Sequence, residues 1–126
     1  MNAILAVAVG GAAGSVARYL VVLGCARLWG TLFPWGTLTV NVAGSFAMGV
    51  VAALLLRFGA AAETVRLLVM IGFLGGFTTF SSFSLDVVGL AQHGETGSAA
   101  AYALASLILS VGGLLVGLRA VQWLAS

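Results

Sequence analysis

Four long apolar stretches make up most of this chain, and they constrain its fold more than any other feature. Crossing the hydrocarbon layer of a bilayer as a helix takes about 20 apolar residues. Only 6% of the 126 residues are charged, whereas soluble domains carry about 25%. The sequence therefore predicts an all-α integral membrane protein with four transmembrane helices, at residues 3–27, 35–56, 65–91 and 98–118.

The connectors between these spans are short, so we expect residues 1–126 to form a single four-helix transmembrane domain. An even number of spans puts both termini and the second connector on one side of the membrane. That side carries Arg57, Arg66 and Arg119, and the other side carries only Arg27. This small bias favours cytoplasmic termini by the positive-inside rule, and it is also compatible with insertion in both orientations.

Composition excludes several other classes of protein. The only cysteine, Cys25, has no partner for a disulfide within the chain. Five scattered arginines and no lysine are too few for a nucleic-acid-binding patch. No nucleophile, base and orienting group fall together in the spans, so we do not expect an enzyme.

An unusual segment lies inside the third predicted span, where residues 72–84 read GFLGGFTTFSSFS. Lipid tolerates irregular backbone only where protein or water covers it. The pair Gly75 and Gly76, followed by Thr78 and Thr79, is a place where a spanning helix can open and present its peptide groups to an ion. We therefore predict that the third helix is broken near residues 75–79 and that the break belongs to a transport site.

Glycines recur at a spacing of four in three of the spans. This pattern lets helix backbones approach closely in lipid, so taken alone it indicates packing between helices. The pairs are Gly10 with Gly14, Gly72 with Gly76, and Gly113 with Gly117.

Polar and aromatic residues form stripes, because side chains three or four residues apart share one face of a helix. The stripes are Thr37, Asn41 and Ser45; Phe73, Phe77, Phe80 and Phe83; and Tyr102, Ser106 and Ser110. Each stripe alone is compatible with hydrogen bonding between helices. Three stripes beside a helix break favour a pathway, and donors without a ring of carboxylates favour a small anion moving down its gradient. The phenylalanine rings would favour an anion if their edges faced the pathway, and a cation if their faces did.

Three runs in the sequence closely resemble the CrcB/Fluc family of fluoride channels. They read GGAAGSVARY at residues 10–19, PWGTLTVNVAGSFAMG at 34–49 and GFLGGFTTFSSFS at 72–84. The resemblance implies an antiparallel, dual-topology homodimer in the cell (inner) membrane, with two pores that passively export fluoride from the cytoplasm and confer fluoride resistance. Its partners would be fluoride, sodium, the lipid bilayer and a second copy of the chain.

The resemblance also assigns roles to individual residues. Asn41 would donate a hydrogen bond to the ion, and Phe80 and Phe83 would present their ring edges to it. The complete fluoride pathway that it implies comprises Asn41, Phe80, Phe83, Tyr102, Ser110, Ser81 and Thr37.

A structural sodium ion is the one cofactor that the resemblance implies. The backbone carbonyls of Gly75 and Thr78, repeated from the partner subunit, would bind it.

Two positions differ from the usual family pattern. Leu114 stands where members commonly carry a threonine one helical turn after the serine of the fourth helix, and the run SSF at 81–83 replaces STF, which keeps a hydroxyl.

Two other classes of membrane protein are alternatives. Small multidrug exporters also have four helices, but proton-coupled antiport requires a titrating carboxylate at membrane depth. Their glutamate lies in the first helix, and this chain has no acid before Glu63. A non-transporting assembly subunit would explain the glycine pairs but not the aromatic and hydroxyl residues at the break.

We expect the remaining ionisable residues to have structural roles or to be solvated. Arg18, deep in the first span, is expected to serve packing, assembly or a vestibule rather than the pore. Asp86 is expected to be solvated near the end of the third helix. His93 and Glu95 lie in a polar connector, where a lone histidine does not make a metal site.

Overall fold

The computed structural model describes residues 2–126, which form helices joined by short turns. The elements are α1 (Ala3–Trp29), α2 (Trp35–Leu55), a short 3-10 helix η1 (Gly59–Ala62), α3 (Glu63–Val65), a π-helical segment η2 (Arg66–Leu74), α4 (Gly75–Phe77), α5 (Phe80–Gln92) and α6 (Thr96–Leu124). The stretch Glu63–Gln92 forms one composite span. It, α1, α2 and α6 are each long and apolar enough to cross a bilayer, which confirms the predicted class.

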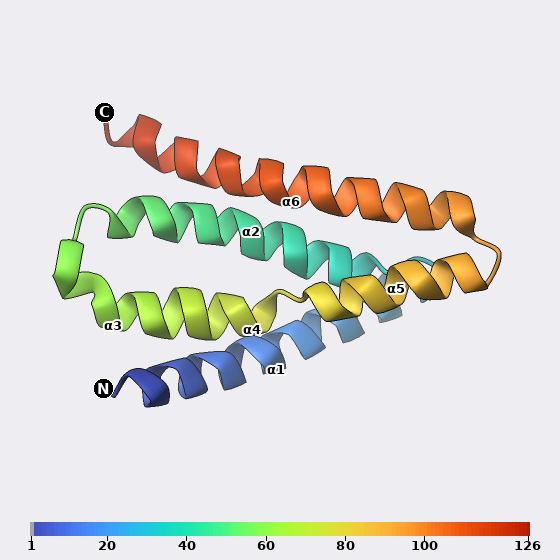
Figure 1. The fold of residues 1–126 in the computed structure, drawn as a ribbon, viewed down its shortest axis with the longest axis horizontal. Coiled ribbons are helices and arrows are strands. Elements are labelled where there is room, and N and C mark those ends of the chain that lie inside the picture. The colour runs from blue at the N-terminus through green and yellow to red at the C-terminus, as the bar shows by residue number, and fades with distance from the viewer. Residues whose placement is uncertain (1) are drawn as a thin grey trace.

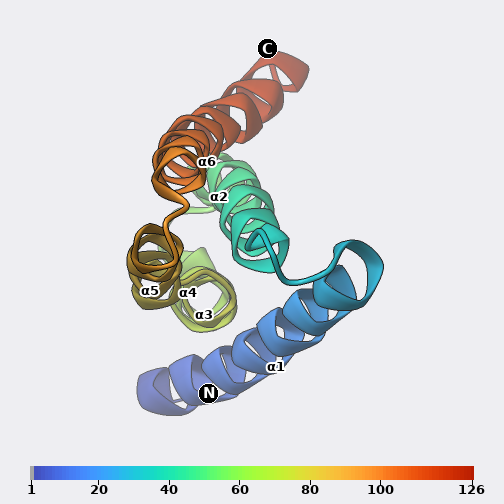
Figure 2. The ribbon, with the colours of Figure 1, turned by 90° about the vertical axis from the view of Figure 1, so that its right-hand side faces the viewer.

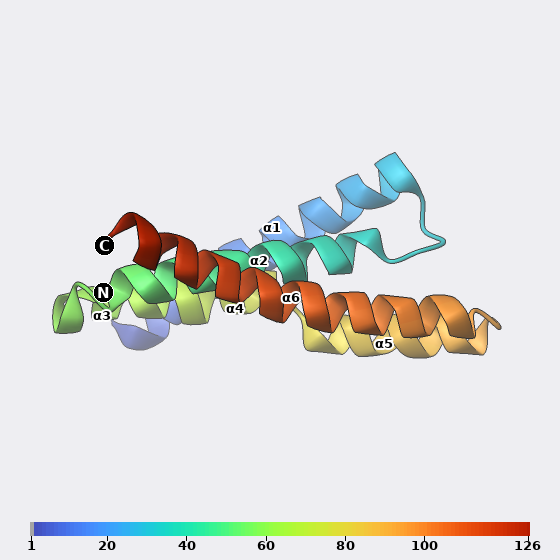
Figure 3. The ribbon, with the colours of Figure 1, turned by 90° about the horizontal axis from the view of Figure 1, so that it is seen from above.

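The four spans lie side by side as long rods (Figure 1). Both termini and η1 lie at one end of the bundle, as an even number of spans requires. In the end view, α1 and α6 lie on opposite sides, with α2 and the composite span between them (Figure 2). The view from above shows that α1 runs obliquely to the other helices (Figure 3).

Close backbone contacts explain the glycine pairs. A side chain at Gly14 would clash with the Phe73 carbonyl of η2, and one at Gly117 would clash with the Phe46 carbonyl of α2. Each glycine thus lets two helices approach to backbone contact, which brings many more atoms into van der Waals range. The packing interpretation is therefore confirmed within a single chain for five of the six glycines, between α1 and the third span and between α2 and α6; at Gly113 a Cβ would make only ordinary contacts, the nearest at 3.4 Å.

The break in the third span lies at Thr78 and Thr79, inside the predicted range. Thr78 has φ −86° and ψ 158°, and Thr79 has φ −154° and ψ 124°, which are extended conformations. Gly75 and Gly76 do not open, because both are helical residues of α4. A Cβ on Gly76 would lie 2.6 Å from the Gly11 carbonyl oxygen. The glycine at 76 therefore serves the contact with α1, and the two threonines form the break.

The fourth span is longer than predicted. α6 continues to Leu124 rather than ending at 118, so it includes Arg119. Arginine is a good helix former, so Arg119 can lie inside the helix and does not mark its end.

Candidate functional site at the break

Asn41 of α2 binds the chain at the break. Its side-chain oxygen accepts a hydrogen bond from the Thr79 amide at 2.8 Å, and its side-chain nitrogen donates to the Thr79 carbonyl at 3.0 Å. These two bonds satisfy both peptide groups of a residue that lies outside any helix. A side-chain amide has two N–H groups, so the second one is left to bind another acceptor.

The break leaves four carbonyls, those of residues 75–78, without their helical amide partners. In a continuous helix, Thr79 would donate to the Gly75 carbonyl and Ser82 to the Thr78 carbonyl. The Thr79 amide donates to Asn41 instead. The Ser82 amide donates to the Thr79 hydroxyl at 3.2 Å, which makes Thr79 the N-cap of α5. The two carbonyls that the sequence predicts to bind sodium, those of Gly75 and Thr78, are therefore among the four that lose their helical amides.

A cavity of about 220 Å³ lies beside the break, between α2, α5 and α6. It brings together Asn41, Phe80, Phe83 and Ser110, which are four of the predicted pathway residues. The centroids of the two phenyl rings are 5.5 Å apart, and the rings are tilted by 46°. The complete lining is Asn41, Ser45, Thr78, Thr79, Phe80, Phe83, Ser106, Leu107, Ser110 and Val111.

Two serines of α6 that line this cavity have buried, unpaired hydroxyls. The side-chain oxygens of Ser106 and Ser110 are buried, and neither has a hydrogen-bond partner within residues 2–126. A buried polar group without a partner costs about 1–3 kcal/mol. Such groups indicate a place where water or a ligand supplies the partner. Because the lining contains no charged side chain, the cavity suits a small ligand held by neutral donors.

Tyr102 is not among the residues that line this cavity, although the sequence predicts it in the pathway. Its side chain is fully buried, and its hydroxyl donates to the Asp86 carboxylate at 2.9 Å. Its ring packs against Phe83, with 5.3 Å between centroids. Thr37 is also buried, and it does not line the cavity.

The prediction for Asp86 is wrong. This residue lies in the middle of α5, is half-buried, and accepts the hydrogen bond of Tyr102. The sequence does not reveal the pair of Asp86 and Tyr102, because the two residues lie in different spans. The available signal was an acid at membrane depth, which requires a donor.

Ser81 also differs from expectation. It is exposed, its hydroxyl lies 3.3 Å from that of Thr79, and it does not line the cavity.

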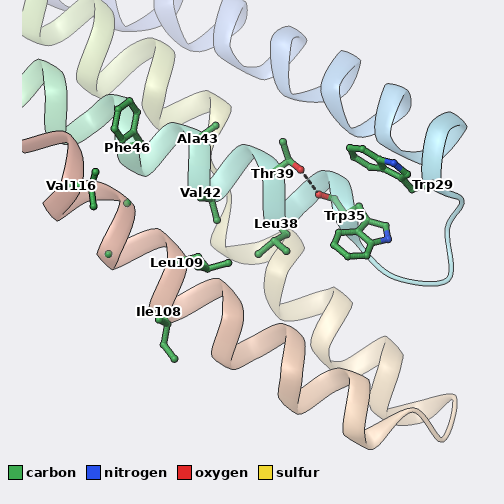
Figure 4. A pocket seen from close by; sticks show the side chains of 12 residues that line it. Trp29, Trp35, Leu38, Thr39, Val42, Ala43, Phe46, Ile108, Leu109 and Val116 are labelled. Atoms are coloured by element: carbon green, nitrogen blue, oxygen red, sulfur yellow. Dashed lines mark hydrogen bonds between the residues drawn. The ribbon is translucent and has the colours of Figure 1, made fainter. Parts of the chain in front are cut away.

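A larger groove of about 1160 Å³ runs along α2 and α6, and it is a poor candidate for an ion pathway (Figure 4). Its only side-chain hydroxyl, that of Thr39, already donates to the Trp35 carbonyl at 2.7 Å. Apart from two indoles at one end, the remaining lining is apolar. The smaller cavity at the break, with its free hydroxyls, therefore remains the candidate site.

Comparison with known proteins covers nearly the whole chain. The family described as "CrcB-like protein, Camphor Resistance (CrcB)" matches residues 5–118. A protein of Rhodospirillum centenum named "Fluoride-specific ion channel FluC" is 56% identical over 97% of both chains. A protein of Agrobacterium fabrum with the same name is 53% identical over 89% of this chain and 90% of its own. Another, from Nitrobacter winogradskyi, is 50% identical over 94% of both chains.

Replacing Asn41 with alanine should loosen the break. Both hydrogen bonds to the Thr79 peptide are lost, and leaving partly buried peptide groups unpaired costs about 1–3 kcal/mol each. We expect the Thr79 amide to exchange its hydrogen about tenfold faster or more, measured by NMR on the protein in lipid nanodiscs. Thr39→Val, which removes a hydroxyl elsewhere on α2, is the matched control. Equal exchange rates in Asn41→Ala and the parent would show that Asn41 does not hold the break.

Proposed function

This chain belongs to the CrcB family, and we propose that it is a fluoride-selective channel that passively exports fluoride from the cytoplasm and so confers fluoride resistance. The observation that carries the proposal is the cavity at the break, which Asn41 lines together with Ser106 and Ser110, two serines whose buried hydroxyls have no partner within residues 2–126. The identity of the ion comes from the relatives, which are named for fluoride.

The alternative functions have no support. A proton-coupled exporter needs a titrating carboxylate at its site, and no carboxylate lines the cavity. A non-transporting subunit would have no use for buried, unpaired hydroxyls. The names of the relatives place the chain among channels, which confirms the expectation that it is not an enzyme.

Fluoride would cross the cavity by exchanging water for weak, neutral donors. The second N–H of Asn41 and the two serine hydroxyls each direct a partial positive charge toward the ion. The edges of the Phe80 and Phe83 rings carry the positive end of the aromatic quadrupole. No full charge lines the cavity, so the ion is bound weakly enough to leave again, which passive conduction requires.

The proposed working unit is an antiparallel, dual-topology homodimer in the cell (inner) membrane, each subunit being one four-helix domain. Phe80 is 74% exposed on the single chain, and Gly75 beside the break is exposed as well. Lipid does not satisfy open backbone groups, so another protein surface has to cover this region. A second copy of the chain is the simplest cover, and the small difference in arginine content between the two sides permits both orientations.

A structural sodium ion at the dimer axis is part of the proposal. The carbonyls of Gly75 and Thr78 have lost their helical amides to Asn41 and Thr79. Open backbone carbonyls in a membrane helix suit a small hard cation. Each subunit would contribute the same two oxygens, so the ion would also link the two copies.

Replacing either phenylalanine of the cavity by isoleucine should lower fluoride flux steeply. Isoleucine keeps much of the apolar bulk but has no quadrupole. We expect the parent protein in vesicles to release fluoride without a proton gradient, and Phe80→Ile and Phe83→Ile to release it at least tenfold more slowly, as read by a fluoride electrode. Phe58→Ile, in the exposed connector between α2 and η1, is the control. Parent flux that needs a proton gradient, or equal flux in all variants, would contradict the mechanism.

The inverted dimer predicts that tags on the N-terminus are found on both faces of the membrane. Labelling with a reagent that does not cross the membrane should therefore reach about half of the copies in intact cells, because dual topology divides them between two orientations. Complete labelling or complete protection would show a single orientation and would exclude the inverted arrangement.

The sodium site predicts a specific effect on stability. Anything that binds only the folded state stabilises it by mass action. We expect the melting temperature of the purified dimer to rise with sodium concentration, and potassium at the same ionic strength to give a smaller rise. Identical melting curves in the two salts would contradict a structural sodium ion.

A further inference from the structure

A line of aromatic rings connects the cavity at the break with the connector between α1 and α2. Phe83, on the cavity wall, contacts Tyr102 of α6 with 5.3 Å between centroids. Tyr102 contacts Phe33 of the connector, with 5.5 Å between centroids. Phe33 in turn contacts Trp35 at 4.6 Å. The line joins three parts of the chain that are distant in sequence.

The connector is built to hold Phe33 in place. It begins at Gly30, whose φ of +79° favours glycine. Pro34 then fixes one backbone angle by its ring. The Trp35 amide donates to the Phe33 carbonyl at 2.8 Å, which closes a tight turn around the proline. The turn thereby places the Phe33 backbone, and the contacts with Trp35 and Tyr102 hold its ring.

The hydrogen bond of Tyr102 leaves one motion of its ring free. The hydroxyl oxygen lies on the axis about which a tyrosine ring turns, so the bond to Asp86 fixes the end of the side chain but not the plane of the ring. Ring contacts have to fix the plane. Phe33 meets the Tyr102 ring at 86°, and Phe83 meets it at 34°. Such pairs have a preferred geometry, so the orientation of one ring constrains the next.

Phe33 and Asp86 also line a second cavity, of about 590 Å³, on the connector side of Tyr102. Tyr102 contacts residues of both cavities, namely Phe83 on the break side and Phe33 and Asp86 on the connector side. The fully buried Tyr102 ring therefore lies between the two spaces. An ion that moved from one space to the other would pass this ring.

We propose that Phe33 is a positioning residue for the ion pathway: its ring fixes the plane of Tyr102, and Tyr102 fixes the plane of Phe83 at the cavity. Phe33 does not itself touch the cavity at the break. The consequence for transport rests on the proposed function, whereas the ring contact does not.

The first measurement is the flipping rate of the Tyr102 ring. The chain has two tyrosines, and Tyr19 is 65% exposed, so ring-labelled tyrosine gives two distinguishable sets of NMR signals. In the parent, the two edges of the Tyr102 ring should give separate signals because the ring flips slowly. Phe33→Leu should merge them, Phe33→Tyr should keep them separate, and Phe58→Leu, in another connector, should change nothing. Separate signals in Phe33→Leu would overturn the proposal.

The second measurement is fluoride flux from vesicles at equal amounts of folded protein. Phe33→Leu should lower the flux about two- to tenfold, in line with the strength of an aromatic pair, and Phe33→Tyr should restore it. If Phe33→Leu fails to fold, Phe33→Met keeps a flexible apolar side chain without the ring and replaces it in both measurements. If the parent conducts fluoride and the variant without the Phe33 ring conducts it equally fast, the proposal is overturned. A parent without any flux would instead overturn the proposed function.

Discussion

Two hydrogen bonds between Asn41 and the Thr79 peptide are the interaction on which the site depends. They replace the helical bond that Thr79 would otherwise make, so the helix of the third span can stop at Phe77 and start again at Phe80. The restart sets the rotation of α5 about its axis. As a result, Phe80 and Phe83 line the cavity, and Asp86 meets Tyr102 of α6.

The close approach of α2 to the break requires a glycine one turn after Asn41. A side chain at Gly44 would clash with the Thr78 methyl group, so either Thr78 would have to rotate out of its hydrogen bond with the Leu74 carbonyl or α2 would have to move away from the break. The glycine contacts between α2 and α6 also help to form the cavity, because they bring the serines of α6 close to it. Close packing in this chain therefore serves the placement of donors as well as stability.

The elements that follow from local rules were predictable from the sequence, and the contacts between spans were not. Lipid demands four apolar spans, and helical periodicity places Asn41 and Ser110 on polar stripes, which the structure brings to one cavity. The break was predicted in the right segment but on the glycines. Glycine permits an opening without requiring one, and here Gly76 is used to pack against α1. Thr79, a residue type favoured at helix N-caps, is the sequence signal that marks the actual break.

Residues whose role comes only from tertiary contacts could not be found in this way. Phe33 lies in a connector without periodicity, and Asp86 acquires its partner from α6, so neither has a local signature. Thr37 belongs to a stripe and Ser81 lies between the phenylalanines of another, yet Thr37 is buried away from the cavity and Ser81 is exposed. A stripe identifies one face of a helix, but the crossing of the helices decides which residues on that face meet at the cavity.

The most direct test of the central claim is to locate bound fluoride. Solid-state ¹⁹F NMR on the protein in lipid bilayers, with ¹³C-labelled serine and asparagine, measures which of these side chains lie within a few ångströms of the ion. The account predicts a bound ¹⁹F signal in contact with Asn41 and with the unpaired serines Ser106 and Ser110, and loss of that signal in Asn41→Ala. A bound signal that keeps its full intensity in Asn41→Ala, or that contacts none of these residues, would contradict it.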